Sequence, residues 1–340
     1  MRMIKINLFT LAWLGVTLNA NSCDLCAVYR AEETKTEGGQ GLIVSLAEQY
    51  IPYRTVQFEG NELQLANPDY VDSSVTHLVV GYDFSRRFGI SLNVPFHHLK
   101  FRRTDLRYSL GAPAVLTTET GTESGVGDIA LIGRMLLFER ATTNSRLVAN
   151  LLAGIKFPTG DTDRLADEVS QAEIYNTFVP PGTPHDPLGH SVTSVHQHSL
   201  TRGSGSFDGI FGITVNGRWK RGFLAGQFQY YLRTVGESDF QFGDEWIASG
   251  GPGVFLVSNS KMSFSAQANV IYDVMGRDEI LGQRSDRTGM KALYLGPLLN
   301  LTVGQQFSAN VGVDLPLRIE NNGFQNVPDY RLQGGLSWRF

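Results

Sequence analysis

Apolar and polar residues alternate along much of this chain with a period of two. Between residues 88 and 97 the even-numbered positions are apolar, whereas between 307 and 317 the odd-numbered positions are apolar. This period is typical of a β-strand with one apolar face, and a slip of one residue would turn every side chain to the wrong face. The predicted strands cover residues 42–58, 74–84, 88–100, 126–138, 145–158, 205–219, 222–234, 244–258, 261–275, 289–303, 306–320 and 329–340.

The connections between these strands alternate between short and long. The short ones cover residues 85–87, 139–144, 220–221, 259–260 and 304–305. The long ones cover residues 59–73, 101–125, 159–204, 235–243, 276–288 and 321–328. An even number of antiparallel strands with short turns at one rim and long loops at the other is typical of outer-membrane barrels. The sequence therefore predicts an all-β fold, a single transmembrane antiparallel β-barrel of about 12 strands with short periplasmic turns and long extracellular loops.

Both ends of the chain agree with this location. The last strand alternates in the same way and ends on Phe340, the residue through which we expect the barrel assembly machinery to bind the chain. At the other end, Arg2 and Lys5 precede an apolar run at 8–18 and a small-residue cleavage site, the pattern of a signal peptide. We therefore expect a signal peptide at 1–22, a periplasmic N-terminal segment at 23–41 and a bacterial outer-membrane β-barrel at 42–340.

Composition agrees with a barrel and excludes other classes. No apolar run approaches the ~20 residues of a membrane-spanning helix, and the mean hydropathy is only -0.12. Barrel strands are short and half polar, so mean hydropathy does not detect them. The net charge of -4 gives no basic footprint for a nucleic acid. Contact with the lipid bilayer is therefore expected, and contact with nucleic acid is not.

The polar faces of the predicted strands should line the lumen and carry charges of both signs. This set comprises Asp83, His97, Asp128, Arg134, Lys156, Arg218, Gln229, Arg233, Asn269, Asp273, Asp314, Arg318 and Arg331. A barrel of about twelve strands is wider than one whose side chains fill it and narrower than a porin. The charges can therefore pair and fill the interior, or they can line a pathway that selects a solute, and the sequence leaves both open.

Three short motifs carry more information than the strand pattern. They are Gly-Val-Gly-Asp-Ile at 125–129, Gly-Ile-Lys-Phe-Pro-Thr-Gly-Asp-Thr-Asp at 154–163 and Gly-Ser-Gly-Ser-Phe-Asp at 203–208. Lys156 and Asp128 should face the lumen near the same rim, where they can form an ion pair. Residues 158–161 also read as a simple turn, because Pro cannot donate to a strand ladder and Gly and Asp tolerate turn geometry.

In these motifs and their order, residues 75–340 resemble the outer-membrane transporter family labelled MetA-pathway of phenol degradation. The resemblance implies an outer-membrane barrel that passes small hydrophobic, often aromatic, solutes. It brings no catalytic residues and no cofactor.

Cys23 and Cys26 precede the barrel, in an oxidising compartment. They can form a small disulfide loop, half of a metal site, or a redox-active pair or partner contact. A thioredoxin-type role needs a βαβ context that does not follow here. Two thiols also supply only part of a tetrahedral zinc site.

The longest predicted loop, 159–204, contains His185, His190, His196 and His198. Imidazole pairs such as His196 and His198 suit copper or zinc, so the four histidines are metal-ligand candidates. Four Pro residues also suit a polar, solvated loop. A third possibility is that the loop folds inward as a plug or lid.

The function classes can be ranked from these features. Residues 40–340 contain no Gly-x-Ser-x-Gly elbow, and no pairing of Ser and His on the lipid-facing wall supports a hydrolase, so we expect no enzyme. The favoured function is passive uptake or efflux of small hydrophobic or aromatic compounds. The alternative is a plugged structural barrel that docks a partner through the N-terminal cysteine segment, or binds a metal or a protein through the histidine-rich loop.

Overall fold

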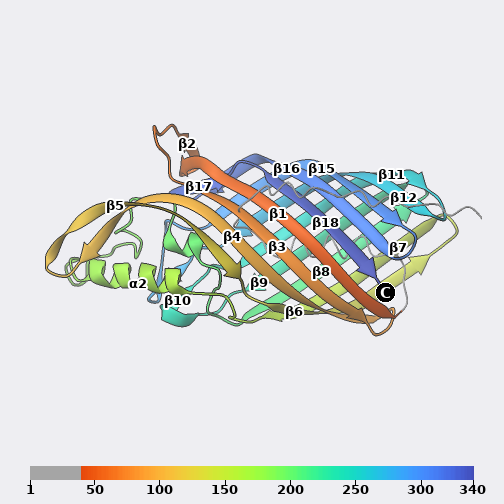
Figure 1. The fold of residues 1–340 in the computed structure, drawn as a ribbon, viewed down its shortest axis with the longest axis horizontal. Helices are drawn as coiled ribbons and strands as arrows, with labels where there is room; N and C mark the ends of the chain where they lie inside the picture. The colour runs from red at the N-terminus through yellow and green to blue at the C-terminus, as the bar shows by residue number, and fades with distance from the viewer. Residues whose placement is uncertain (1–39) are drawn as a thin grey trace, which may run out of the picture.

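A computed structural model describes residues 40–340 of the chain. The predicted signal peptide at 1–22, nearly all of the segment 23–41, and both Cys23 and Cys26 lie outside the described residues. In Figure 1 the strands of the described part wind around one axis and enclose a lumen.

Twelve strands form a closed ring. Every neighbouring pair is antiparallel, and β1 closes the ring by pairing with β3 on one side and β18 on the other. The ring strands are β1 (Gly41–Phe58), β3 (Tyr70–Asp83), β4 (Phe88–Ser109), β6 (Ala130–Ala141), β7 (Ser145–Lys156), β8 (Asp208–Trp219), β9 (Gly222–Leu232), β11 (Glu245–Ser258), β12 (Met262–Met275), β15 (Met290–Val303), β16 (Phe307–Asn321) and β18 (Arg331–Arg339). Closure leaves no free edge in the ring, which is what a lipid bilayer demands. The predicted barrel is confirmed.

Side chains alternate between the outer wall and the lumen. The outer wall exposes large apolar side chains on strands all round the ring, among them Leu46, Leu92, Leu151, Phe228 and Leu336. An apolar outer band is the surface that faces lipid acyl chains. Within residues 40–340, no helix is both long enough and apolar enough to cross a membrane.

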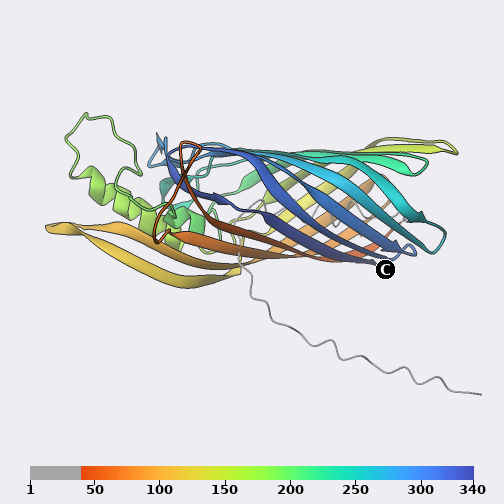
Figure 2. The same ribbon diagram turned by 90° about the horizontal axis from the view of Figure 1, so that it is seen from above.

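The prediction of a loop at 101–125 is wrong, because most of this segment forms two β-strands. β4 continues past the ring to Ser109, and β5 (Ala112–Val126) returns along it in antiparallel register. Only the first part of β4 belongs to the ring, where it pairs with β6. The Thr-rich run at 117–122 favours a strand, and Gly111 takes a φ of +76° in the turn. The result is a long hairpin beyond the barrel (Figure 2).

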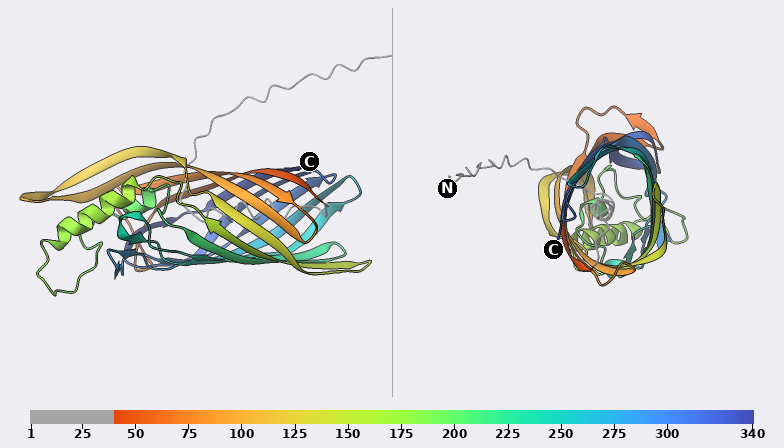
Figure 3. Two further views of the ribbon diagram at one scale, coloured as in Figure 1. Left: turned by 90° about the horizontal axis from the view of Figure 1, so that it is seen from below. Right: turned by 90° about the vertical axis from the view of Figure 1, so that its right-hand side faces the viewer.

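Residues 159–204, which we call the plug segment, fold across the end of the barrel that carries the long connections (Figure 3). The segment contains α2 (Asp163–Asn176) and the short helix η1 (Gln197–Leu200). Leu165, Leu188 and Leu200 are 0% exposed. The prediction of a polar, solvated loop is therefore wrong. The structure contains the alternative, a segment that folds inward as a plug.

The amphipathic pattern of α2 explains why it docks. Leu165, Val169 and Ala172 recur at helical spacing and form one buried face. That face packs in a cluster with Leu188, Phe240 and Ile280. Phe240 and Ile280 belong to a small second sheet made of β10 (Phe240–Gln241), β13 (Glu279–Ile280) and β14 (Gln283–Arg284). The remaining elements are β2 (Asn61–Leu63), β17 (Phe324–Pro328) and the short helix η2 (Glu237–Asp239).

Polar contacts from three sides hold the plug segment in place. From β4, the buried Arg103 donates from Nε to the Val195 carbonyl at 3.1 Å. From the loop before β15, Arg287 donates to the carbonyls of Leu188 and Ser191. The backbone N–H of Asn326, in β17, donates to the Ser194 carbonyl at 3.1 Å.

Candidate solute pathway

A cavity of about 290 Å³ lies between the plug segment and the lumen wall. The wall contributes side chains from several strands, including Asn93, His97, Tyr231, Met275 and Met290. The plug segment contributes residues 194–196, 198–199 and 201–204. The cavity is therefore a space at the mouth of the lumen that the plug segment roofs.

The three sequence motifs meet at the edge of this cavity, around Asp128. Asp128 belongs to the first motif. Its carboxylate accepts hydrogen bonds from the backbone N–H groups of Gly160 in the second motif and Ser204 in the third. A Cβ atom on Gly160 would overlap the backbone of Arg202 and Gly203. The motif glycines thus allow the end of the plug segment to approach the strand ends closely.

Lys156 stands between two carboxylates. Its Nζ lies 2.9 Å from Asp128 Oδ2 and 2.8 Å from Asp208 Oδ2. Arg233 continues the row, with contacts of 3.1 Å to Asp208 and 3.0 Å to Glu245. The structure therefore contains the expected ion pair of Lys156 with Asp128, within a row of alternating charges. Each cation here is matched by carboxylates, so the cavity wall carries no excess of positive charge.

The end of the lumen near the short turns has its own charge cluster. Asp83 lies 2.7 Å from both Arg134 and Arg339. Arg218 lies on the inward-facing side of β8 but is exposed at this rim, where Nη2 donates to the Ser258 hydroxyl at 3.1 Å and the guanidinium covers the Phe255 ring. Arg134 and Arg218 therefore lie at the opposite end of the barrel from Lys156.

Between these ends, two further polar groups line the wall. Arg331 lies 2.6 Å from Asp273 and covers the ring of Tyr294. Asp314 accepts hydrogen bonds from the amides of Asn269 at 2.7 Å and Gln333 at 2.6 Å. Paired groups therefore account for most of the predicted lumen set.

The prediction for Arg318 is wrong. A β-bulge between Leu293 and Tyr294 shifts the pairing register of β15 and β16 by one residue. Arg318 consequently pairs with Leu293 on the outer face, its side chain is 75% exposed, and it forms an ion pair with Glu320 at 2.5 Å. A bulge of this kind turns later side chains to the opposite face, which strict alternation cannot foresee.

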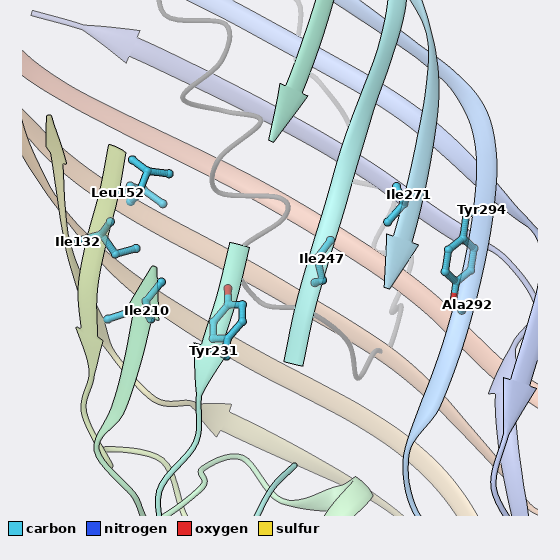
Figure 4. Packing of buried hydrophobic residues seen from close by; sticks show 10 residues of the cluster. Ile132, Leu152, Ile210, Tyr231, Ile247, Ile271, Ala292 and Tyr294 are labelled. Atoms are coloured by element: carbon cyan, nitrogen blue, oxygen red, sulfur yellow. The ribbon is translucent and has the colours of Figure 1, made fainter. Parts of the chain in front are cut away.

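Sequence reasoning also missed an apolar cluster on the lumen side of eight of the twelve strands, which we call the apolar ring. Ten buried apolar residues from eight strands form one cluster, in which Ile132, Leu152, Ile210, Ile247 and Ile271 point inward (Figure 4). The other members are Val79, Ala130, Tyr231, Ala292 and Tyr294. The available signal was a pair of consecutive apolar residues, such as Leu151 and Leu152, where alternation requires one polar residue. The lumen is therefore partly apolar, unlike the polar interior that alternation alone suggests.

The four histidines of the plug segment are not brought into one ligand set. His185 and His190 lie against Tyr175, whereas His196 and His198 stack on each other with ring centroids 5.2 Å apart. In residues 40–340, no group of three or more His, Cys, Asp or Glu side chains could hold a metal ion. The structure therefore does not bring the four together: Tyr175 packs against two of them and Glu168 contacts the other two.

Glu168 connects α2 to these stacked rings. Its Oε2 lies 2.7 Å from His198 Nδ1, and its Oε1 lies 3.6 Å from His196 Nδ1. Burial alone would raise the pKa of Glu168, but His198 and His196 hold this pKa well below its usual value. Burial alone would likewise lower the pKa of His198, but Glu168 raises it overall. Burial raises the pKa of Asp278, whose carboxylate faces the other side of His198 at 3.8 Å.

A closed barrel with an apolar outer wall and an enclosed lumen is suited to a lipid bilayer. The chain is an outer-membrane β-barrel. Its fold is similar to the crystal structure of the COG4313 outer membrane channel from Pseudomonas putida F1, with a TM-score of 0.61 and 13% identity over 91% of this chain and 98% of that chain. This likeness establishes the fold alone.

Two more distant barrels also align. The translocator domain of the autotransporter NalP from Neisseria meningitidis gives a TM-score of 0.41 and 11% identity over 92% of this chain and 93% of that one. The TodX deltaS2S3 mutant monoaromatic hydrocarbon channel gives 0.40 and 9% identity over 91% and 92%. No protein-family model matches the sequence, and no curated protein matches it. The likeness to the MetA-pathway family therefore stays a resemblance carried by the three motifs.

Proposed function

We propose that this barrel is a passive channel that carries small hydrophobic or aromatic compounds across the outer membrane, in uptake or efflux. The observation that carries the proposal is the apolar ring inside the lumen, next to a cavity of about 290 Å³. A pathway for ions or sugars needs polar groups along its length. Ile210, Ile247 and Ile271 are at most 2% exposed and pack inside the lumen, so they form an apolar constriction at which an ion or a sugar would lose its hydration.

The charge arrangement supports the same function. Lys156 and Arg233 are matched by carboxylates at the cavity, so the wall offers little long-range attraction for an ion of either sign. The solved structure that aligns with a TM-score of 0.61 is described as an outer membrane channel, which supports a channel function for this chain. Transport here needs neither catalysis nor an energy-coupling domain.

The proposal extends to the ends of the chain. Residues 1–22 would be removed as a signal peptide, and residues 23–41 would stay on the periplasmic side as the approach to the barrel. Phe340 would be the contact for the barrel assembly machinery. The backbone N–H of Phe340 pairs with Leu42 at the point where β18 meets β1, which agrees with a closing strand.

The first test is conductance of the purified, folded barrel in a planar lipid bilayer, with and without phenol. We expect discrete conductance steps that phenol blocks, because the solute and the ions share one narrow path. Uptake of radiolabelled toluene by cells with and without the protein tests transport directly. Equal uptake by both cell types would contradict the proposal.

A second candidate is a plugged barrel that docks a periplasmic partner through the N-terminal segment. The observation that favours it is the fixing of the plug segment by Arg103 and Arg287. A folded barrel that conducts no current, carries no toluene and co-purifies with a periplasmic protein would favour this function over transport.

A further inference from the structure

The wall of the lumen carries one arginine whose hydrogen-bonding capacity is mostly unused. Arg331 is 1% exposed and lies on the inward-facing side of β18. Its Nη2 donates to Asp273 Oδ2 at 2.6 Å. Its Nε and Nη1 have no hydrogen-bond partner in the described part of the chain, and neither has Oδ1 of Asp273. Buried polar groups in proteins are nearly always paired, so these three atoms require an explanation.

This group lies next to the cavity and within the apolar ring. Met275, which lines the cavity, follows Asp273 by two residues on the same face of β12, a step of about 7 Å. Ile271 precedes Asp273 by two residues and belongs to the apolar ring. The ring centroid of Tyr294, another ring member, lies 4.0 Å from the guanidinium carbon of Arg331. The Tyr294 hydroxyl is a further buried polar atom without a hydrogen-bond partner in residues 40–340. Arg331 and Asp273 are 1% and 2% exposed and lie outside the cavity lining, so a solute would reach their free donors and acceptor by moving from the cavity past Met275 along this wall.

We propose that Arg331 and Asp273 form a binding site for the hydroxyl group of a neutral, largely apolar solute. A hydroxyl can accept from one of the free N–H groups of Arg331 and donate to Oδ1 of Asp273, so one group meets both a free donor and the free acceptor. The apolar body of the solute then rests against the ring around Ile271. This inference rests on the proposed function, because it identifies which solutes the pathway favours.

Other ligand classes fit this pair of residues less well. A hydrocarbon gives the free donors and the free acceptor no partner, so it gains nothing from them, whereas a hydroxyl satisfies groups that are already buried and unpaired. A carboxylate could accept from Arg331 but would place a second negative charge beside Asp273. Because the guanidinium of Arg331 is already matched by Asp273, the site has no net charge to attract an anion.

Binding of three probes of similar size tests this assignment. Radiolabelled phenol, toluene and benzoate are measured by equilibrium dialysis against the full mature barrel in lipid nanodiscs, with protein-free nanodiscs subtracted. The variant R331M/D273L removes both charged partners, so no unpaired buried charge remains. We expect it to weaken phenol binding by about tenfold and to change toluene binding by less than about twofold.

Two further variants keep the test decisive. R331K keeps the positive charge beside Asp273 but loses the guanidinium fork, so phenol binding should weaken severalfold even where the double variant folds poorly. R339M removes another lumen arginine on the same strand, about 27 Å away along it, and should leave phenol binding unchanged. Heat-modifiable migration on a gel checks that each barrel is folded.

The outcomes separate this inference from the proposed function. Phenol binding that is equal in the wild type, R331K and R331M/D273L would overturn the site while leaving transport untouched. Benzoate as the tightest ligand, lost in R331M/D273L, would overturn the assignment to neutral solutes. Phenol binding that depends on Arg331, in cells that take up no solute, would contradict the proposed function and leave the site standing.

Discussion

The imidazole Nδ1 of His198 lies 2.7 Å from the carboxylate Oε2 of Glu168, and this contact ties the end of the plug segment to α2. The backbone N–H of His198 donates to the same oxygen at 2.7 Å. The side chains of His198 and Glu168 are 12% and 2% exposed, so the charge state of this pair bears directly on whether the plug segment stays in place.

The first prediction concerns pH. The pKa of His198 is raised above 6.5, so its stabilising contribution is complete below pH 6.5 and is lost as pH rises through the raised value. The pKa of Glu168 lies below 4.5, so its contribution is present above pH 4.5 and is lost as pH falls through the lowered value. The plug segment should therefore be most firmly docked between these two values.

Hydrogen exchange of the α2 amides at a series of pH values, corrected for the intrinsic rate, measures this docking. Protection should be greatest between pH 4.5 and 6.5 and should decline above it. Asp278, whose pKa is raised from 3.8, contributes in the opposite sense at the acid limit and should blunt it. The H198N variant should lose the decline above pH 6.5, and a decline of unchanged size would exclude His198 as its source.

A second prediction concerns ion selectivity. Replacing Lys156 and Arg134 with Ala removes one cation from each end of the lumen and leaves the carboxylates of Asp128, Asp208 and Asp83 less compensated. Any ion current should then become more cation-selective. The reversal potential under a salt gradient measures this. Arg318→Ala is the matched control, because Arg318 lies on the outer face, and an equal shift in that variant would contradict the lumen assignment.

The barrel could be predicted closely from the sequence, and the plug segment could not. Strand pairing is a local period-two pattern, so β12 and β18 follow from the residues alone. The bulge that turns Arg318 outward depends on the register between two strands, which no single strand encodes. The docking of α2 depends on contacts with residues far away in the chain, such as Phe240 and Ile280.

The candidate site could likewise be predicted only in part from the sequence. The ion pair of Lys156 and Asp128 could be expected, because Lys156 ends β7 and Asp128 lies just before the neighbouring strand β6. The apolar ring could not, because inward-facing residues such as Ile210 break the rule that lumen positions are polar. Such exceptions to a local pattern are expected at functional sites.

A third prediction concerns the contact that holds the plug segment to β4. The Arg103 guanidinium is buried, bonds to the Val195 carbonyl and lies 2.5 Å from Asp105. Arg103→Ala should destabilise the docked plug segment by up to about 3 kcal/mol, because it leaves the buried Asp105 carboxylate without its cation, with only the hydrogen bonds from Ser191 and Val192 remaining across the contact. Single-channel recordings should then show larger or longer openings. Arg107→Ala is the control, because Arg107 forms a half-exposed pair with Asp167 that is worth far less, and identical openings in both variants would contradict a role specific to Arg103.

The last prediction tests the apolar ring itself. Ile247 is 0% exposed and points into the lumen, whereas Leu295 is a large apolar residue exposed on the outer wall. Ile247→Asn places an amide in the ring, which should raise ion conductance and lower toluene uptake severalfold, because water and ions then compete for an apolar path. Leu295→Asn has the same change in composition on the lipid face and should leave both readouts near wild type in barrels that fold. Conductance and uptake that respond equally to the two substitutions would mean that apolar solutes do not cross through the ring.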